Sequence, residues 1–252
     1  MNNTIAQFSE TVKNLVDQAA SANESSIEQA SDLVAGVIEK DELVHIVGTG
    51  GHSTFGPQEV FWRAGGLAAV NPLLPASLLI PMGAKTSNFM ERSSGIAAAV
   101  LDAYGVGRGD LLIIVNAYGI NPMTIETALE ASKRGTTTIG VTSTSFPENV
   151  PAGAPARHSS GKNLHDLVDV FLDTRMPYGD ACVGIEGSDV QVAPVSTIMN
   201  SFVLHTLVIR TAEKLVERGI TPPVWASANM PEGDDLNRQW HEKYDTRVRH
   251  LR

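Results

Sequence analysis

The amino-acid sequence predicts an α/β fold: a doubly wound, five-stranded parallel sheet flanked by helices, with an N-terminal helical pair. Short apolar runs alternate with longer segments of helical period between residues 44 and 173, which is typical of repeated βα units. These runs are apolar nearly throughout, as expected of parallel strands that helices cover on both faces. Two more helical patterns precede the first run, and one follows the last.

The helical pair occupies residues 1–40. Apolar residues recur at helical spacing over residues 5–16 and again over 27–38, on either side of the Ser- and Asn-rich break SANESS. Residues 41–220 form the α/β core and 221–252 a C-terminal tail of a single domain, since neither a linker nor an internal repeat divides the chain. The pair needs an apolar surface to cover, so we expect a homo-oligomer, dimer or tetramer, with sites near the subunit boundary.

The elements of the core follow in order. The expected strands are VHIVG (44–48), SLLI (77–80), DLLIIVN (110–116), TTTIGVTS (136–143) and VDVFLD (168–173). The expected helices are GPQEVFWRAGGL (56–67), SSGIAAAVLDAYG (93–105), PMTIETALEASKRG (122–135) and a long, mostly buried helix over 195–219 that ends at Gly219. The passage 147–163, rich in Pro, Gly and Ser, is too long for a connector and is a candidate functional loop. The tail from Thr221 should wrap the surface or meet a partner subunit.

Charge and composition exclude several classes of partner. The net charge of -9 opposes attraction to nucleic acid or to an anionic membrane. The first 24 residues lack the basic start and apolar core of a signal peptide, and nowhere is there an apolar run of about 18 residues. We therefore expect a cytoplasmic protein without nucleic-acid or membrane partners. The single cysteine, Cys182, excludes an internal disulfide and is expected to be a small buried residue without a role.

The stretch GTGGHST (48–54) joins a strand end, a Gly-rich turn and a helix start, a combination typical of an anion site. It lacks the third glycine and the later acid of a dinucleotide fingerprint, and it lacks the lysine of a P-loop. The polar loops NAYGINPMT and TSTS follow later strands and should meet it at the same sheet edge. The candidate binding residues are Gly50, His52, Ser53, Thr54, Asn116, Tyr118, Gly119, Asn121, Thr142, Ser143 and, in the long loop, Lys162.

The order of these motifs resembles the SIS (sugar isomerase) domain family over roughly residues 40–220, and most closely a bacterial subfamily of phosphosugar isomerases. The matching segments include GTGGHS, EVFWRAGGL, ALEASKRGTTTIGVTS, RHSSGKNL, GDACV, PVST and PPVWASANMPEGDDLN. The resemblance implies a flavodoxin-like strand order, a sugar-phosphate ligand and dimers or tetramers. One departure is that Asn116, Tyr118 and Asn121 stand where the family's middle loop usually has Ser or Thr. Amide and phenol groups still donate hydrogen bonds, so phosphorylated and unphosphorylated sugars both stay open. Alternatively, Asn116 and Tyr118 merely finish a strand.

Isomerisation of a sugar needs a base that moves a proton between adjacent carbons and an acid that opens the ring. Glu91 lies near the place where relatives have a catalytic glutamate, although it could instead be a charge at a helix N-terminus. Glu59 is a second candidate, or one half of a surface ion pair. His158 is the first choice for the acid, supplied by a neighbouring subunit as in SIS dimers, and His52 is the second. His205 lies in an apolar helix and is expected to be a core histidine. No spacing suits a metal, so we predict no obligatory metal or cofactor.

Three functions fit these residues. The leading hypothesis is an aldose–ketose phosphosugar isomerase that acts through an enediol. The first alternative is elimination, as in the related muramic acid phosphate etherases, and the second is a non-catalytic sugar-phosphate sensor.

Overall fold

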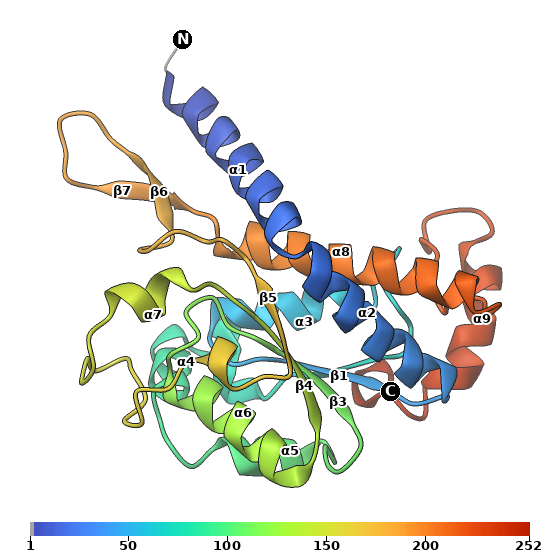
Figure 1. Ribbon diagram of the computed structural model, residues 1–252. Coiled ribbons are helices and arrows are strands. Elements are labelled where there is room, and N and C mark those ends of the chain that lie inside the picture. Colours follow the sequence, from blue (N-terminus) through green and yellow to red (C-terminus); the bar gives the residue numbers. More distant parts are fainter. Residues whose placement is uncertain (1–2) are drawn as a thin grey trace.

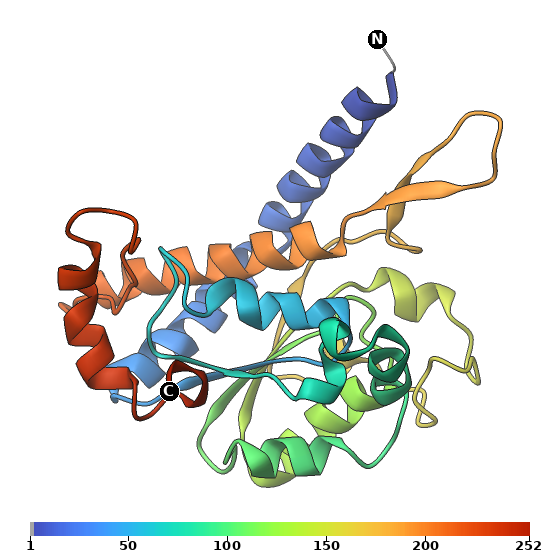
Figure 2. The same ribbon diagram turned by 180° about the vertical axis from the view of Figure 1, so that it is seen from behind.

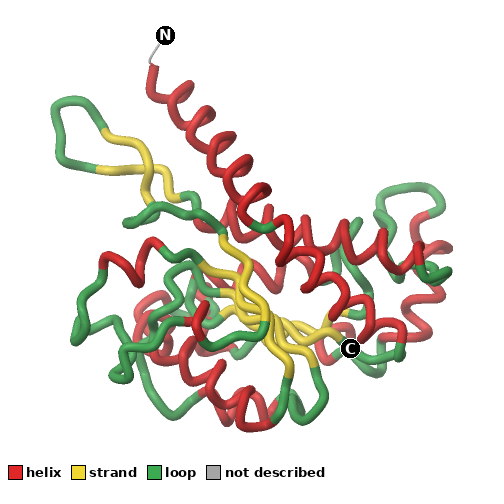
Figure 3. The backbone as a smooth tube through the Cα atoms, viewed as in Figure 1, coloured by secondary structure: helices red, strands yellow, loops and turns green. Residues whose placement is uncertain are grey.

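The computed structural model describes residues 3–252 and contains a five-stranded parallel sheet in the order β2-β1-β3-β4-β5 (Figure 1). This is the flavodoxin-like order expected from the sequence, and all four strand pairs are parallel. The strands are β1 (Val44–Gly48), β2 (Val70–Leu73), β3 (Leu111–Val115), β4 (Thr137–Thr142) and β5 (Val170–Asp173). The strands lie at the centre of the α/β core with helices on both sides of them (Figure 3).

The predicted helical pair is confirmed as α1 (Asn3–Ala22) and α2 (Glu24–Glu39). The other helices are α3 (Phe55–Val60), α4 (Ala84–Glu91), α5 (Ala97–Ala103), α6 (Pro122–Arg134), α7 (Ser145–Asn149), α8 (Ser196–Glu217) and α9 (Gly233–Tyr244). A two-stranded antiparallel hairpin, β6 (Ala181–Gly184) and β7 (Gln191–Pro194), stands apart from the sheet. Cys182 is half-buried in this hairpin, where its thiol donates to the Ala193 carbonyl at 3.3 Å.

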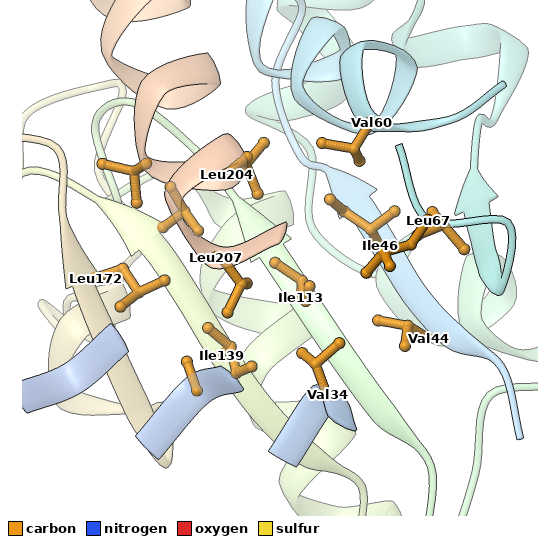
Figure 4. Close-up of a cluster of buried hydrophobic side chains, with 14 of the residues drawn as sticks. Val34, Val44, Ile46, Val60, Leu67, Ile113, Ile139, Leu172, Leu204 and Leu207 are labelled. Atoms are coloured by element: carbon orange, nitrogen blue, oxygen red, sulfur yellow. The ribbon is translucent and has the colours of Figure 1, made fainter. Parts of the chain in front are cut away.

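Two apolar layers enclose the sheet because successive strand residues point to opposite faces. On β3, Ile113 packs in the cluster that contains α2, α3 and α8, while Leu112 and Ile114 pack in the cluster that contains α5 and α6. Figure 4 shows the first layer, in which Leu204 and Leu207 of α8 approach the strands. The doubly wound architecture follows directly from this apolar character on both faces.

The first half of α1 projects beyond the sheet together with the β6–β7 hairpin (Figures 1 and 2). Only Leu15 and Ala19 of α1 are buried, whereas Ile5 is 79% exposed. Asn23 ties the junction of α1 and α2 to the sheet, because its side chain accepts from the Asp173 N–H and donates to the Asp173 carbonyl, both at 2.7 Å. The helical pair is therefore anchored at its middle and uncovered at its N-terminal end.

The predicted second strand is wrong. Residues 77–80 belong mainly to two 3-10 turns, and the strand is formed earlier, by Val70–Leu73. Pro72 lies inside that strand, although proline cannot donate to a sheet ladder. β2 is however an edge strand that pairs only with β1, so the missing N–H costs nothing on its open side.

Other boundaries also differ from the prediction. The helix expected over 56–67 ends at Val60, and Trp62 after it has a left-handed φ of 50°. Helices α4, α7 and α9 and the β6–β7 hairpin were not predicted from the sequence. The tail wraps the surface as predicted: Trp225 exchanges backbone hydrogen bonds with residues 65 and 66, and α9 follows.

Candidate active site

The loop after β1 folds back on itself so tightly that it needs glycine. A Cβ on Gly48 would lie 2.2 Å from the backbone oxygen of Ser53, a contact that no side chain can relieve. A Cβ on Gly50 would lie 2.7 Å from the Glu91 Oε2, and a Cβ on Gly51 would lie 2.9 Å from the Ser87 hydroxyl oxygen. The Gly-rich loop thus brings its backbone against α4, the helix that carries Glu91.

A cavity of about 340 Å³ opens beside this loop, at the carboxyl ends of β1 and β3. Such a position is where doubly wound sheets bind ligands. Its walls are formed by Gly50, Gly51, His52, Ser53, Ile80, Ala84, Ser87, Asn88, Glu91, Arg92, Asn116, Ala117, Tyr118, Asp180 and Ser196.

Glu91 presents a half-buried carboxylate to this cavity. Its Oε2 accepts the Gly51 N–H at 3.1 Å. Burial raises the pKa of Glu91 above its ordinary value, while the Gly51 N–H and the charges of Arg92 and His52 act in the opposite direction. Glu91 is the last residue of α4, so the alternative that it is a charge at a helix N-terminus is wrong. A buried carboxylate of raised pKa is a stronger base than a solvated one.

Three predicted residues present hydrogen-bonding groups to the same cavity. Ser53 accepts from the Ala117 N–H at 3.3 Å, and its own hydroxyl proton has no acceptor among the described residues. The Asn116 Oδ1 accepts from the N–H groups of Tyr118 and Gly119, whereas the Nδ2 group makes no hydrogen bond within residues 3–252. Burial, together with the charges of Asp180 and Glu91, raises the pKa of the Tyr118 phenol, so the phenol remains a donor at neutral pH. His52 is exposed at the same wall, beside Phe55.

Two charged residues of the cavity, Arg92 and Asp180, were not predicted from the sequence. Arg92 lines it and forms no ion pair with any other described residue. Asp180 accepts hydrogen bonds from the N–H groups of Val195 and Ser196 and from the Ser196 hydroxyl, and so occupies the N-terminus of α8. Both could have been suspected, because Arg92 directly follows Glu91 and Asp180 lies in the GDACV segment. Neither Arg92 nor Asp180 comes directly after one of the expected strands, where binding residues are usually found.

Besides Lys162, five predicted binding residues do not line the cavity. The Thr54 hydroxyl donates to the Gly51 carbonyl at 2.6 Å, and the Ser143 hydroxyl donates to the Met176 carbonyl at 2.7 Å. Asn121 donates to the Ala156 carbonyl at 3.0 Å. Gly119 has a φ of 67° and packs so close to Thr142 that a Cβ would lie 2.6 Å from its hydroxyl oxygen. These side chains shape the loops instead of facing the space between them.

His158 lies elsewhere in the chain. It borders a second cavity between α5 and α6, where its Nε2 is 3.8 Å from the Glu126 carboxylate and its Nδ1 is 2.7 Å from the Ser160 hydroxyl. Lys162 is exposed in the same long loop. A single chain therefore does not bring His158 and Glu91 into one cavity.

Glu59 and His205 form a pair outside the Glu91 cavity. The Glu59 Oε1 is 3.0 Å from the His205 Nε2 and 3.2 Å from the Arg63 Nε. The prediction of a core histidine is wrong, because the His205 side chain is 39% exposed on the face of α8 beside α3. The long apolar helix that suggested burial turns this side chain outward.

Comparison with known proteins shows the family to which this chain belongs. The sequence model of the SIS domain matches residues 7–143, more than half of the chain. The chain belongs to the SIS domain family. A UPF0309 protein of Caldanaerobacter subterraneus is 34% identical over 247 residues, which cover 97% of this chain and 98% of that protein. A UPF0309 protein of Brucella canis is 37% identical over 227 residues, 90% of each chain.

Solved SIS-like structures share the fold. A phosphoheptose isomerase from Francisella tularensis superposes with a TM-score of 0.53 at 17% identity, covering 84% of this chain and 97% of that one. A phosphoheptose isomerase from Neisseria gonorrhoeae gives a TM-score of 0.52 at 16% identity, with the same coverage of both chains. At these identities the likeness concerns the fold alone.

Residues 3–252 contain neither a candidate membrane helix nor a candidate metal cluster. None of the helices in this range is both long and apolar enough to cross a membrane. The same range contains no cluster of three or more His, Cys, Asp or Glu side chains that could hold a metal ion.

Proposed function

We propose that the chain binds a sugar phosphate in the Glu91 cavity and isomerises it between aldose and ketose through an enediol. The observation that carries this proposal is the Glu91 carboxylate, half-buried, of raised pKa and held by the Gly51 N–H among hydrogen-bond donors. The SIS domain match and the phosphoheptose isomerases of similar fold support a sugar phosphate as the ligand.

The charges of the cavity suggest where the anion binds. Arg92 offers a cation that no described carboxylate neutralises through an ion pair. The part of the lining at Asp180 is unsuitable, because Asp180 already occupies the N-terminus of α8, where an anion would otherwise be favoured. We therefore assign the phosphate to the side of Arg92, and the reacting carbons to the space between Glu91 and Asn116.

The chemistry then needs one base and a set of donors. Glu91 removes the proton from C2 of the open-chain aldose, the electron pair forms the C1=C2 bond, and the carbonyl oxygen at C1 takes up a proton. The C2 hydroxyl then loses its proton while Glu91 returns the first proton to C1, which yields the ketose. Ser53, Asn116 and Tyr118 would stabilise the enediolate oxygens by donating hydrogen bonds. His52 is the imidazole that lines the same cavity, and we assign ring opening to it within one chain.

Turnover in deuterated water tests this proposal. A panel of aldose and ketose phosphates should interconvert with deuterium from solvent appearing at the transferred position, because an enediol exchanges its proton through the base. Glu91→Gln should abolish both conversion and exchange. The control is Glu148→Gln, which makes the same chemical change on an exposed carboxylate without an ion pair to any described residue.

Other results would refute the isomerase proposal. A product of lower mass would indicate elimination, since isomers conserve mass. A sugar phosphate that raises the melting temperature but is never converted would indicate a sensor. At about 100 times its dissociation constant such a ligand adds about 2.7 kcal/mol of stability, which a thermal scan detects.

We further propose that the chain forms a homodimer through α1, α3 and α8. Helices α1 and α3 both pack against α8, and the three helices leave apolar side chains exposed, namely Ile5 (79%), Phe55 (38%), Ile198 (39%) and Ile209 (60%). A second copy is the occupant that supplies a matching apolar surface by two-fold symmetry. The proposal predicts a dimeric mass by light scattering.

Mixed subunits test whether the partner contributes to the active site. Mixed Glu91→Ala and His158→Ala subunits should regain activity if His158 completes the partner's site. Failure to regain activity despite proven subunit exchange would exclude a shared site.

A further inference from the structure

A second group of candidate binding residues lies at the end of the molecule formed by the tail and α9. The rings of Trp62, Trp225 and His241 pack against one another, with centroid distances of 4.8 Å between the indoles and 5.1 Å from each indole to the imidazole. A cavity of about 270 Å³ opens beside the two indoles. We call it the aromatic pocket. Within residues 3–252 its lining shares no residue with the Glu91 cavity.

The tail segment that forms this pocket is rigidly held. Asn237, 5% exposed, accepts from the Ala226 N–H at 2.8 Å and donates to the Ala226 carbonyl at 3.0 Å. Gly233 packs so closely that a Cβ would lie 2.1 Å from the Ser227 backbone oxygen. Trp225 is fixed on the other side by backbone hydrogen bonds with Gly65 and Gly66. The backbone that forms the pocket is therefore fixed on both sides.

Trp62 carries two unfavourable features at once. Its φ of 50° is left-handed, a conformation that is strained for a bulky residue. Its side chain nevertheless remains 51% exposed instead of filling a core. Backbone strain at a non-glycine residue persists where the surrounding structure enforces it, often at ligand sites. The strain here holds an indole at the mouth of a cavity, in contact with solvent.

The composition of the pocket indicates a class of ligand. Two indoles provide apolar walls, and Arg63, Ser227 and Asn229 place polar groups beside them. A sugar ring has complementary surfaces, an apolar C–H face that packs on an aromatic ring and a rim of hydroxyls that bond to polar groups. Arg63 is already paired with Glu59, and Asp235 at the start of the adjoining helix α9 is paired with Arg238. Glu232 and Asp234 beside it form no ion pair with any described residue, so the net negative charge here disfavours phosphate.

We propose that the aromatic pocket is a binding site for a neutral monosaccharide unit, separate from the Glu91 cavity. The sugar ring would stack on Trp62, with its hydroxyls toward Ser227 and Asn229. The small volume suits a single ring. This proposal does not depend on the isomerase proposal, because each cavity has its own residues.

Tryptophan fluorescence tests the pocket directly. The chain has three tryptophans, and the third, Trp240, packs against Tyr244 instead of lining the pocket. In a Trp240→Phe protein, D-glucose, D-galactose or N-acetyl-D-glucosamine should therefore give a saturable change in emission. We expect a dissociation constant on the order of 1 mM for a ligand of this size, and weaker binding for the phosphate esters.

Variants separate the two cavities. In the same background Trp62→Ala should weaken sugar binding at least about tenfold, and Trp62→Phe should weaken it less, because a ring face remains. Glu91→Gln should leave the titration unchanged, so a failure of the isomerase proposal would be visible separately. The proposal is overturned if no neutral sugar gives a saturable change, or if the phosphate esters bind the pocket more tightly. It is equally overturned if Trp62→Ala lowers the solution mass without affecting sugar binding, since Trp62 would then be a subunit contact.

Discussion

Gly50→Ala should inactivate the proposed active site while leaving the fold intact. The backbone permits alanine, because the φ of Gly50 is not positive. The added Cβ would however lie 2.7 Å from the Glu91 Oε2 and 2.9 Å from the Asn116 Nδ2. Ordinary contact begins at 3.4 Å, so the carboxylate must retreat by about 0.7 Å and the amide by about 0.5 Å. Both contacts are ends of side chains that can move, so we expect a loss of only about 1 kcal/mol in stability.

The effect on turnover should be much larger. Misplacing a reacting group by about 1 Å can lower the rate by about 100-fold, and here the proposed base and one donor move together. The measurement is kcat/KM for the sugar phosphate that the wild-type protein converts, together with the urea midpoint. Gly107→Ala is the matched control, because its φ is not positive and its added Cβ would have nothing within 4 Å. Wild-type turnover in a folded Gly50→Ala protein would refute the argument that Glu91 acts from beneath this loop.

Three more perturbations test packing and electrostatics. Asn23→Ala should lower the free energy of unfolding by about 2–3 kcal/mol, because it leaves the buried N–H and carbonyl of Asp173 without their partner; a urea midpoint near that of wild type would contradict this. Gly36 lies inside α2, and the nearest atom to a Cβ added there would be the Arg218 Nη1, 3.9 Å away. Gly36→Ala should therefore raise the free energy of unfolding by about 0.5–1 kcal/mol in the same assay, and a decrease would contradict the open space around this position. Glu91→Gln should stabilise the protein at about pH 8 but much less at about pH 4. The raised pKa favours the protonated carboxyl in the folded state, so the contribution of Glu91 is present below its ordinary pKa of 4.5 and is lost as pH rises through the folded value; an equal effect at both pH values would refute this.

The sequence alone was sufficient to predict the architecture. Apolar strands such as LLIIV carry buried side chains on both faces, so they require helices on both sides and a parallel arrangement. The parallel arrangement in turn brings the ends of β1 and β3 to one edge, which is why Ser53, Asn116 and Tyr118 could be assigned to one site before the structure was known. Periodicity is a local property that a single sequence carries, whereas the strand order was expected from the resemblance to the SIS family.

Tertiary structure decided the remaining features, because each depends on neighbours distant in sequence. Pro72 is acceptable in a strand only because that strand lies at the sheet edge, a fact that its own residues do not contain. Thr54 and Ser143 looked like ligand contacts, yet both hydroxyls are used by backbone carbonyls, since a nearby buried carbonyl needs a donor.

The charged residues of the site also have features that the sequence predicts and features that only the tertiary structure decides. Glu91 could be proposed from the place of the catalytic glutamate in relatives, but its raised pKa comes from burial in the folded chain, where its carboxylate meets the Gly51 N–H, 40 residues earlier in the sequence. His158 had the right chemistry and an apt loop, yet the chain folds it against Glu126 in another cavity. Sequence determines which chemical groups are available. Only the packing of the loops around the sheet edge determines which of these groups share a cavity, because the distances between them are set by the whole fold.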